Sequence, residues 1–523
     1  MTKDDSLVLG IDLGTTRSVS AIVDDTGKPQ TIQNSEGDLT TPSVVLFEDD
    51  CVSIGKEALK AAAILPDQVA RFAKREMGKD TFSHEVNGQA YPPEMIQSLI
   101  LGRLRRDAES RLGQKVQSAV ITVPAYFDEP KRRSTMDAGL LAGLDVKAVI
   151  NEPTAAAIAF GMESTQATRR RSSSADGSQT ILVYDLGGGT FDASIVRVDG
   201  NKIDVIATDG NGMLGGMDWD KCLSRWLDAK FAVNHNIKPS ETATGEAMLW
   251  RESEDIKHSL TSRKRVDLRV AYEGHLLSTE ITRDEFEEIT AHLLDRTRFT
   301  VRKLVQDAKL SWIEIDKVVL VGGSTRMPQV SAMLLRESGI EPDSTVSADE
   351  AVAHGAAIYA ATLADRPDAE DATKLTITDV NAHNLGVLGV DKVTGSRCNH
   401  VMIPRNTPLP AAKATRFETI RDDQPSVAVE VIEGGDARGQ HATQIGRCVI
   451  HDLPSNLPAG TPVDVLFRYD TDGLINVKAS LPTIGQQASL RIDRASGLSS
   501  EERTKMRDIH LALGLDPDDD EED

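Results

Sequence analysis

Two short segments rich in glycine and hydroxyl residues could bind phosphate groups. Residues 8–23 read VLGIDLGTTRSVSAIV and residues 181–196 read ILVYDLGGGTFDASIV, so each has an apolar run, Asp-Leu-Gly, small or hydroxyl residues and a second apolar run. Glycines let backbone N–H groups approach an anion closely, and threonine hydroxyls add donors. The aspartates, Asp12 and Asp185, would lie beside the phosphates, where a hard Mg²⁺ that keeps some of its waters is stabilised.

The two segments are separated by a domain-sized interval, because Asp185 follows Asp12 by 173 positions (185 minus 12). This repetition predicts an internal duplication into two similar lobes, each with a β-hairpin whose turn faces the other. One such turn alone commonly does no more than close a hairpin. Two matching copies with the same aspartate favour a nucleotide held between the lobes.

A third segment could contribute a nucleotide contact. The strand-like run Lys317–Val321 is followed by GGSTRMP at residues 322–328. A strand, paired glycines and a helix start with proline in its first turns are typical of an anion- or nucleotide-binding junction. Taken alone, such a junction is more often only a tight turn between a strand and a helix.

Motifs of several other enzyme classes are absent from the sequence. Residues 210–215 match the spacing GxGxxG, but polar Thr208 and Asp209 precede the first glycine and Gly216 delays a helix, so we do not expect a dinucleotide-binding fold. The chain has no G-x-x-x-x-G-K-S/T, HExxH or GxSxG. This excludes P-loop enzymes, metalloproteases and serine hydrolases as interpretations.

Predicted helices and strands alternate over residues 1–366, and these elements must position the glycine-rich segments. Helical periodicity predicts helices over 94–112 and 283–310, and apolar runs predict strands over 116–123, 181–184 and 317–321. A polar stretch rich in arginine and serine, 168–179, is expected to be a solvated loop. This alternation is the mark of an α/β architecture.

The pattern changes after residues 364–373, a charged segment with a proline that is expected to be a linker. Beyond it the apolar period becomes two over 426–432, 463–469 and 474–480, with a hairpin signal at 470–473. These features predict an antiparallel β-sandwich. The domains we expect are 1–366, a linker over 367–379, the sandwich over 380–495, and a tail over 496–523 with a helix at 499–513 and disordered acidic residues at 516–523.

The composition of the chain limits its partners and its location. Its 523 residues include 59 Lys and Arg against 81 Asp and Glu, a net charge of −22, which disfavours nucleic acid and anionic membranes as main partners. Cys51, Cys222, Cys398 and Cys448 form no CxxC pair, so we expect buried free thiols in a reducing compartment. With no secretory signal and no apolar run of the ~18 residues that a membrane helix needs, a cytoplasmic protein is expected.

Several segments together resemble one known family. GIDLGTTRS, INEPTAAAIAFG, VYDLGGGTFDASIV and VVLVGGSTRMPQV resemble the ATPase domain of the seventy-kilodalton heat-shock chaperones, the DnaK family, and RNTPLP, SVAVEVIEGG and YDTDGLINVKAS resemble its β-rich half. The resemblance extends from Leu7 to about Arg507, and the INEPTAAA core is specific to the family, whereas actins and sugar kinases share only the two hairpins. The implied fold class is α/β: a two-lobed actin-like ATPase domain followed by an antiparallel β-sandwich that binds peptides.

The resemblance implies a role for each matching residue of the ATPase domain, with ATP, Mg²⁺ and K⁺ as ligands. Lys74 would orient the attacking water, with Glu152 beside it, and Asp192 would assist with potassium or the water. Asp12 and Asp185 would surround the metal ion through waters. The catalytic set is Lys74, Glu152, Asp185, Thr190 and Asp192. The phosphates would be held by Gly14, Thr15, Thr16, Arg17, Gly187, Gly188, Gly189 and Thr190. The adenosine would be held by Glu254, Lys257, Thr261, Gly322, Gly323, Ser324 and Arg326.

Two residues of this region have simpler interpretations when the resemblance is set aside. Lys74 then reads as an exposed lysine of a surface helix, so its catalytic role depends on the resemblance. His258 lies in the adenosine region and is expected to be an ordinary polar helix residue.

The resemblance also implies residues that connect the domains and residues that bind peptide. The relay between nucleotide and linker would comprise Pro124, Arg132, Leu375, Ile377 and Asp379. An extended apolar peptide would bind in a groove at Val387, Phe417, Val427 and Val429. For each of these four residues, an ordinary place in the core of the sandwich is an equally good interpretation.

The chain departs from the family pattern in its linker and in one partner site. Thr376 and Thr378 replace apolar linker residues, and each exchange removes on the order of 1 kcal/mol of apolar burial, so weaker docking of the linker is expected. Ala148, beside Lys147, stands where the family has a basic residue that helps to dock a J-domain cochaperone. Recognition of a standard J-domain partner is therefore in question.

Two peripheral parts also differ from the pattern. The region between Lys74 and Pro92 is short, which trims one subdomain of the ATPase domain. We expect no long helical lid after the sandwich, so bound peptide is expected to escape faster. The loop 389–399 beside the groove is longer than usual.

The resemblance implies an ATP-dependent chaperone for extended apolar segments of unfolded proteins, with hydrolysis regulating peptide affinity. It also implies a nucleotide exchange factor as a further partner. The main alternative is a nucleotide-gated scaffold of the same fold with weak or uncoupled ATPase activity, which the linker, Ala148 and the missing lid favour. An actin-like filament protein has no use for the C-terminal sandwich, and a sugar kinase lacks INEPTAAA.

Overall fold

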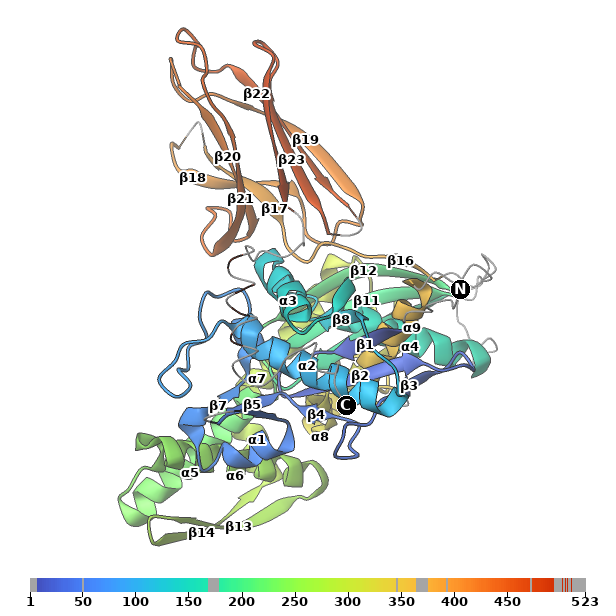
Figure 1. Cartoon of the computed structure of the whole chain (residues 1–523), viewed down its shortest axis with the longest axis vertical. Coiled ribbons are helices and arrows are strands. Elements are labelled where there is room, and N and C mark those ends of the chain that lie inside the picture. The colour runs from blue at the N-terminus through green and yellow to red at the C-terminus, as the bar shows by residue number, and fades with distance from the viewer. Residues whose placement is uncertain are drawn as a thin grey trace.

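The computed structural model describes most of the chain (Figure 1). The described residues are 7–48, 51–167, 178–344, 347–363, 375–391, 394–470 and 473–492, with Glu501, Thr504, Met506 and Ile509. The segments predicted at 364–373 and 516–523 lie outside them, as do most of the loop expected at 168–179 and most of the helix expected at 499–513. The four isolated residues are helical, and Met506 packs in the core of the first lobe.

The first lobe, lobe I, is built on a mixed sheet with the order β3-β2-β1-β8-β9, and β4 pairs with β2. The strands are β1 (Val8–Asp12), β2 (Arg17–Val23), β3 (Pro29–Thr31), β4 (Thr41–Pro42), β8 (Ser118–Val123) and β9 (Asp145–Asn151). Helices α2 (Pro93–Leu112) and α3 (Glu129–Leu141) complete its core. A small sheet, β6-β5-β7, carries α1 (Lys56–Ala61) and comprises β5 (Val44–Phe47), β6 (Val52–Ile54) and β7 (Val69–Arg71).

The second lobe, lobe II, repeats the central arrangement of the first. Strand β1 pairs antiparallel with β2 and parallel with β8, and β10 pairs antiparallel with β11 and parallel with β15. The sheet has the order β15-β10-β11-β12-β16, with β10 (Gln179–Leu186), β11 (Phe191–Asp199), β12 (Lys202–Asn211), β15 (Lys317–Val321) and β16 (Thr376–Thr378). Around it lie α5 (Gly216–His235), α6 (Ala243–Ser262), the hairpin β13 (Arg265–Tyr272) and β14 (His275–Thr282), α7 (Arg283–Asp307) and α8 (Pro328–Ser338). The matching topology supports the predicted duplication.

Two packed helices, α4 (Glu152–Ala167) and α9 (Ala351–Leu363), connect the lobes. Helix α9 contacts β1 and β2 of lobe I, and α4 contacts β10 and β11 of lobe II. A Cβ atom on Gly355 would lie 1.7 Å from the carbonyl oxygen of Ala155, and a Cβ on Gly10 would lie 2.2 Å from the nitrogen of Ala357. Only glycine permits such close backbone contact, so these positions hold α9 against both α4 and β1.

The last part of the described chain is a sandwich of two four-stranded sheets, β18-β17-β20-β21 and β19-β22-β23-β24, drawn in orange to red in Figure 1. All its strand pairs are antiparallel. The strands are β17 (Leu385–Val390), β18 (Arg397–Ile403), β19 (Ala411–Glu418), β20 (Val427–Gly434), β21 (Ala442–Ile450), β22 (Pro462–Tyr469), β23 (Ile475–Leu481) and β24 (Gln486–Ile492). One apolar cluster from both sheets fills the interior, which confirms the predicted β-sandwich.

The linker docks on lobe II as strand β16, which pairs in parallel with β12 (Figure 1). Leu375 and Ile377 pack against the apolar cluster beneath it. Thr376 is exposed, and the Thr378 hydroxyl hydrogen-bonds to the Asp204 carboxylate. The two threonines that were expected to weaken docking therefore occupy positions that need little apolar burial, and the linker is docked in their presence.

Several predictions from the sequence need correction. Cys51 is exposed because it lies in the β5–β6 connection, Cys222 and Cys398 are half-buried, and only Cys448 of the four free thiols is buried as expected. Part of the loop predicted at 389–399 forms the paired ends of β17 and β18, so the connection shortens to 391–396. Helix α7 ends at Asp307 rather than at residue 310. No helix in the described part of the chain is long and apolar enough to span a membrane.

Candidate functional site

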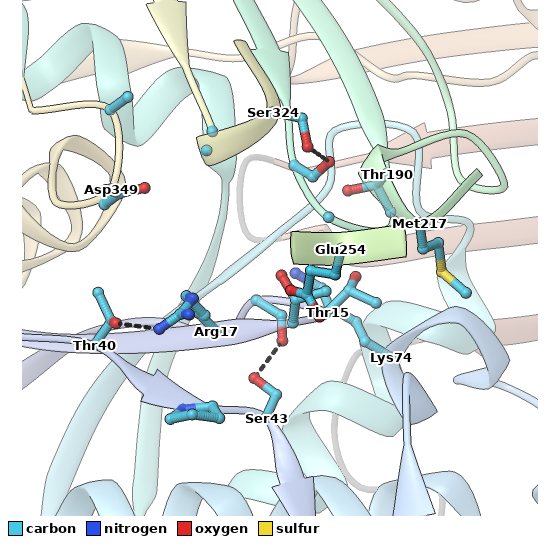
Figure 2. Close-up of a pocket in the computed structure, with 18 of the residues that line it drawn as sticks. Thr15, Arg17, Thr40, Ser43, Lys74, Thr190, Met217, Glu254, Ser324 and Asp349 are labelled. Atoms are coloured by element: carbon cyan, nitrogen blue, oxygen red, sulfur yellow. Dashed lines mark hydrogen bonds between the residues drawn. The ribbon is translucent and has the colours of Figure 1, made fainter. Parts of the chain in front are cut away.

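The two glycine-rich turns meet across a cavity between the lobes. A Cβ atom on Gly188 would lie 2.3 Å from Thr16 Oγ1, and a Cβ on Gly189 would lie 2.3 Å from Thr15 Cγ2. No side chain fits at these distances, so glycine is required where the turns touch. The cavity has a volume of about 430 Å³ and is lined by both turns and by the junction that follows β15. Figure 2 shows side chains of both lobes converging on it.

The structure brings together nearly all the residues predicted for nucleotide binding. Those that line the cavity are Asp12, Gly14, Thr15, Thr16, Arg17, Lys74, Glu152, Asp185, Gly187, Gly188, Thr190, Glu254, Lys257, Thr261, Gly322, Gly323, Ser324 and Arg326. Gly189 and Asp192 lie just behind it. The Gly189 carbonyl accepts a hydrogen bond from Arg75 Nε (2.7 Å), and Asp192 Oδ1 accepts one from the backbone N–H of Tyr126 (3.0 Å).

Lys74 is buried, which corrects its interpretation as a surface helix lysine. It lies in the 3₁₀ turn Ala73–Glu76, is 2% exposed, and has its Nζ 2.5 Å from Glu152 Oε1 at the start of α4. The same turn carries Arg75, whose Nη2 lies 2.5 Å from Asp218 Oδ2 of α5. The sequence analysis missed Arg75 and Asp218, for which the only signal was the position of Arg75 next to Lys74.

Burial and mutual repulsion perturb the carboxyl groups around Lys74. Burial, with the charge of Glu152 as the next cause, raises the pKa of Asp12 to about 7 and the pKa of Asp192 to about 7. The pKa of Asp185 is raised well above its usual range, again by burial first and then by Glu152 and Asp192. The lysine ammonium opposes these shifts. The carboxyl groups around Lys74 therefore carry more negative charge than this lysine balances, and a cation would relieve the excess.

The part of the cavity predicted to hold adenosine also contains a buried ion pair. Lys257 Nζ lies 2.6 Å from Asp220 Oδ2, and burial raises the pKa of Asp220 to about 6. Ser324 Oγ donates to the Gly187 carbonyl (3.0 Å), which ties the GGSTR junction to the second phosphate turn. Burial lowers the pKa of His258, which lies on α6 and lines the same cavity. Asp220 was missed, since nothing in its local sequence marks it.

Two of the predicted relay residues, Arg132 and Asp379, are joined by hydrogen bonds through Asn151. Arg132 Nη2 donates to Asn151 Oδ1 (2.6 Å), and Asn151 Nδ2 donates to Asp379 Oδ2 (2.9 Å). Pro124 begins the turn that precedes α3, where its carbonyl accepts from Phe127 N. Asn151, which joins the two charged residues, belongs to the INEP motif but was not singled out from the sequence.

Ala148 lies in β9, opposite Val120 of β8, and packs against the contact between β8 and α9. Lys147 is partly exposed and pairs with Asp145. The ammonium group of Lys147, the basic residue next to Ala148, is therefore paired with a carboxylate on the same strand.

The sandwich contacts the two-lobed domain through groups that the sequence analysis missed. Arg405 Nη2 lies 2.9 Å from Asp209 Oδ2 of β12 and 2.5 Å from Asp307 Oδ2 of α7. His383 Nε2 lies 2.9 Å from the Tyr126 carbonyl oxygen, and Glu433 Oε2 accepts from the backbone N–H of Glu129 (2.8 Å). Asn406 Oδ1 accepts from Thr208 N (2.9 Å). These contacts join residues 98 to 304 positions apart in the chain, so no local sequence pattern predicts them.

The four residues predicted for peptide binding all pack in the sandwich core. Val387, Val427 and Val429 are buried, and Phe417 is partly exposed with its ring against that of His400 (centroids 4.9 Å apart). The burial of the three valines agrees with their alternative interpretation as ordinary core residues of the sandwich.

An Asp185→Asn variant is expected to be more stable than the wild type at pH 8 without nucleotide or metal. The amide keeps the shape of the carboxylate and removes one charge from a buried acidic cluster, so relief on the order of 1 kcal/mol would raise the unfolding midpoint by about 2 °C. With Mg²⁺ and ADP the variant should gain less stability than the wild type, because one carboxylate facing the cation is lost. Thermal unfolding with EDTA and with Mg·ADP measures both effects, and a variant less stable in EDTA would contradict the repulsion.

The chain matches known proteins over nearly its whole length. The model of the Hsp70 protein family matches residues 8–87 and 79–512. The chaperone protein DnaK of Halobacterium salinarum, from strains R1 and NRC-1, is 39% identical over 508 residues, which covers 96% of this chain and 77% of the relative.

Proposed function

The chain belongs to the Hsp70 family of molecular chaperones, and we propose that it binds extended apolar segments of unfolded polypeptides and regulates their affinity by hydrolysing ATP. One observation carries this proposal. The two duplicated turns, the GGSTR junction and the buried Lys74–Glu152 pair converge on a single cavity between the lobes. That combination provides phosphate donors, acidic groups for a cation and a positioned lysine in one site.

The residues of the cavity fit phosphoryl transfer to water. Backbone N–H groups of the two turns and the hydroxyls of Thr15, Thr16 and Thr190 are proposed to hold the phosphates. Lys74 Nζ is proposed to orient the attacking water and to stabilise the negative charge that develops on the transferred phosphoryl group. Glu152 fixes Lys74 through their 2.5 Å contact. Because both are buried, this geometry exists before substrate binds.

The acidic residues of the site fit a hard cation. Asp12 and Asp185 are buried carboxyl groups whose raised pKa values reflect unbalanced negative charge. Within the described residues no group of three or more His, Cys, Asp or Glu side chains is arranged to hold a metal ion, so Mg²⁺ would take other ligands from water and phosphate, as it commonly does. A Mg²⁺ ion held beside Asp12 and Asp185 would supply neutralisation of the phosphate charge. We assign K⁺, as a second cation, to the neighbourhood of Asp192.

The adenosine is assigned to the end of the cavity formed by Glu254, Lys257, Thr261 and the GGSTR junction. The Lys257–Asp220 ion pair lies in the wall of the cavity at this end. Val387, Phe417, Val427 and Val429 are proposed to open onto the peptide groove from the sandwich core.

Communication between the sites is proposed to run along the chain from Arg132 through Asn151 to Asp379 and the docked linker strand. A peptide that binds better to the undocked sandwich shifts the population away from the docked state. A J-domain cochaperone and a nucleotide exchange factor are proposed as partners. The first would contact Lys147 rather than Ala148, in exchange for the exposed ion pair of Lys147 with Asp145.

Single-turnover hydrolysis of bound ATP, with and without an excess of a short apolar peptide, tests the function. We expect the peptide to accelerate hydrolysis about fivefold or more, which is the scale of a typical coupling free energy between two sites. An Asp379→Asn variant, which weakens the acceptor for Asn151 at nearly constant shape, should respond less. A peptide that binds without any change in hydrolysis would replace the proposal by an uncoupled nucleotide-binding scaffold.

A further inference from the structure

Three side chains meet across the cleft at the Glu254 end of the cavity. Phe72 follows β7 of lobe I, and its ring centroid lies 5.2 Å from that of Trp250 on α6 of lobe II. The guanidinium carbon of Arg71 lies 4.7 Å from the Phe72 ring centroid and 5.6 Å from that of Trp250. All three line the nucleotide cavity.

Trp250 is not required for the packing of its own helix. The residues that α6 buries are Gly245, Leu249, Ser253, Ile256, Lys257 and Leu260. Trp250 lies off this set, is only half-buried, and finds its aromatic partner on the other lobe. Its position four residues before Glu254 places both side chains on one face of the helix, toward the cleft.

The backbone of Phe72 is held in an unusual conformation. Its φ of 65° places it in the left-handed region, which costs a residue with a Cβ atom on the order of 1 kcal/mol. Such strain persists where the surroundings determine the conformation, and it is enriched at functional sites. Phe72 also caps the 3₁₀ turn that carries Lys74 and Arg75, and its carbonyl accepts from Arg75 N (3.0 Å). Phe72, whose ring contacts the other lobe, is thus only two residues before Lys74 in the sequence.

Arg71 adds an electrostatic attraction between the lobes. Burial lowers the pKa of its guanidinium, while the facing carboxylates of Glu254 and Asp220 act in the opposite direction. Its Nε is buried without a hydrogen-bond partner among the described residues. A cation that packs against both aromatic rings and is attracted by two carboxylates of lobe II draws lobe I toward α6.

We propose that Arg71, Phe72 and Trp250 form an interlobe latch that slows the departure of nucleotide from the cleft. The latch rests on the proposed nucleotide site, because it closes the same cavity. Opening the lobes enough to release a bound nucleoside must separate the Phe72 and Trp250 rings and withdraw Arg71 from lobe II. Release is therefore slower than it would be in the same fold without these side chains.

The test is the dissociation rate of a fluorescent ADP, N-methylanthraniloyl-ADP, from the full chain, followed in a stopped-flow instrument after a chase with unlabelled ADP. A Trp250→Ala variant is expected to release it about tenfold faster, the combined scale of one aromatic pair and one cation–π contact. Trp250→Phe keeps a ring in place and should stay within about twofold of the wild type. Trp226→Ala is the matched control: Trp226 lies in α5 of the same lobe, contacts Lys230 and does not line the cavity.

A second variant separates the ring from the strained backbone. Phe72→Gly removes the ring and relieves the left-handed strain, so it should accelerate release to a similar degree while nucleotide-free unfolding shows a folded protein. Dissociation within twofold of the wild type for both Trp250→Ala and Phe72→Gly would overturn the latch while leaving nucleotide binding intact. A wild-type chain that binds no labelled ADP would instead overturn the proposed nucleotide site itself.

Discussion

A Lys74→Ala variant is expected to hydrolyse bound ATP at least about 100-fold more slowly than the wild type while still binding it. Lys74 is the cation placed among Glu152, Asp12 and Asp185, and it is 2% exposed. A buried, pre-positioned group aimed at developing charge contributes about 10²–10³ in rate in comparable sites. Its removal also leaves Glu152 without its partner in a buried site. The measurement is single-turnover hydrolysis with radiolabelled ATP at saturating protein.

The chain offers a matched control in the same cavity. Lys257 is also buried and pairs with a carboxylate at a similar distance, 2.6 Å from Asp220, but it lies at the end assigned to adenosine. Lys257→Ala should raise the Kd for ATP and leave the single-turnover rate within a few-fold of the wild type. If both variants lost hydrolysis to the same degree, or if Lys74→Ala retained more than a tenth of the rate, the role proposed for Lys74 would be wrong.

The elements around the cavity could be predicted because each has a local signature. Two Asp-Leu-Gly turns between alternating apolar runs identify two hairpins, and their repetition predicts that the turns face one another. The strand Lys317–Val321 was predicted to the residue because a glycine pair ends it. In the sandwich, the alternation with period two and the Gly473 turn predicted the β22–β23 hairpin for the same reason.

Residues whose role arises only in three dimensions could not be predicted in this way. Lys74 resembled a surface lysine because a short 3₁₀ turn has no helical periodicity to reveal which side is buried. Trp250 lies off the buried face of its helix, and only the approach of Phe72 from the other lobe gives it a function. Glu433 meets the first turn of α3 across 304 positions of sequence. A solitary acidic residue in a strand carries no signal of such a partner.

The second large effect that we expect is a dependence on pH of the docking between the sandwich and the two-lobed domain, and it arises from Glu433. Glu433 is 9% exposed, and its carboxylate accepts from the backbone N–H of Glu129 at the first residue of α3. Burial raises its pKa to about 8, with the charges of Glu129 and Asp128 acting in the same direction and Arg132 in the opposite one. A helix N-terminus favours an anion by about 0.3–1 kcal/mol. Desolvation and two facing carboxylates outweigh that preference.

The sign of the effect follows from the raised pKa. The docked state binds the proton more tightly than the undocked state, in which the pKa returns to about 4.5. Docking is therefore strongest below the undocked value and weakens as pH rises toward 8, with a tenfold loss per unit as the limiting slope. His383 acts in the opposite sense, because burial lowers its pKa and docking then requires the neutral ring. Its effect is confined to pH values below about 6.5, so Glu433 dominates between pH 6.5 and 8.

A Glu433→Gln variant should remove this dependence. The amide stays neutral at every pH and can still accept from Glu129 N, so the variant should dock more strongly than the wild type at both pH 6.5 and pH 8, and its advantage should grow by about tenfold between the two values. Hydrogen exchange of the amides in β16, compared between the two proteins at the same pH, measures docking because the intrinsic exchange rate cancels. Glu430→Gln is the control: Glu430 lies on the same strand, is only half-buried and pairs with exposed Arg397, so no change is expected. Weaker protection of β16 in Glu433→Gln at both pH values would mean that the ionised carboxylate stabilises docking through the N-terminus of α3, and the predicted sign would be reversed.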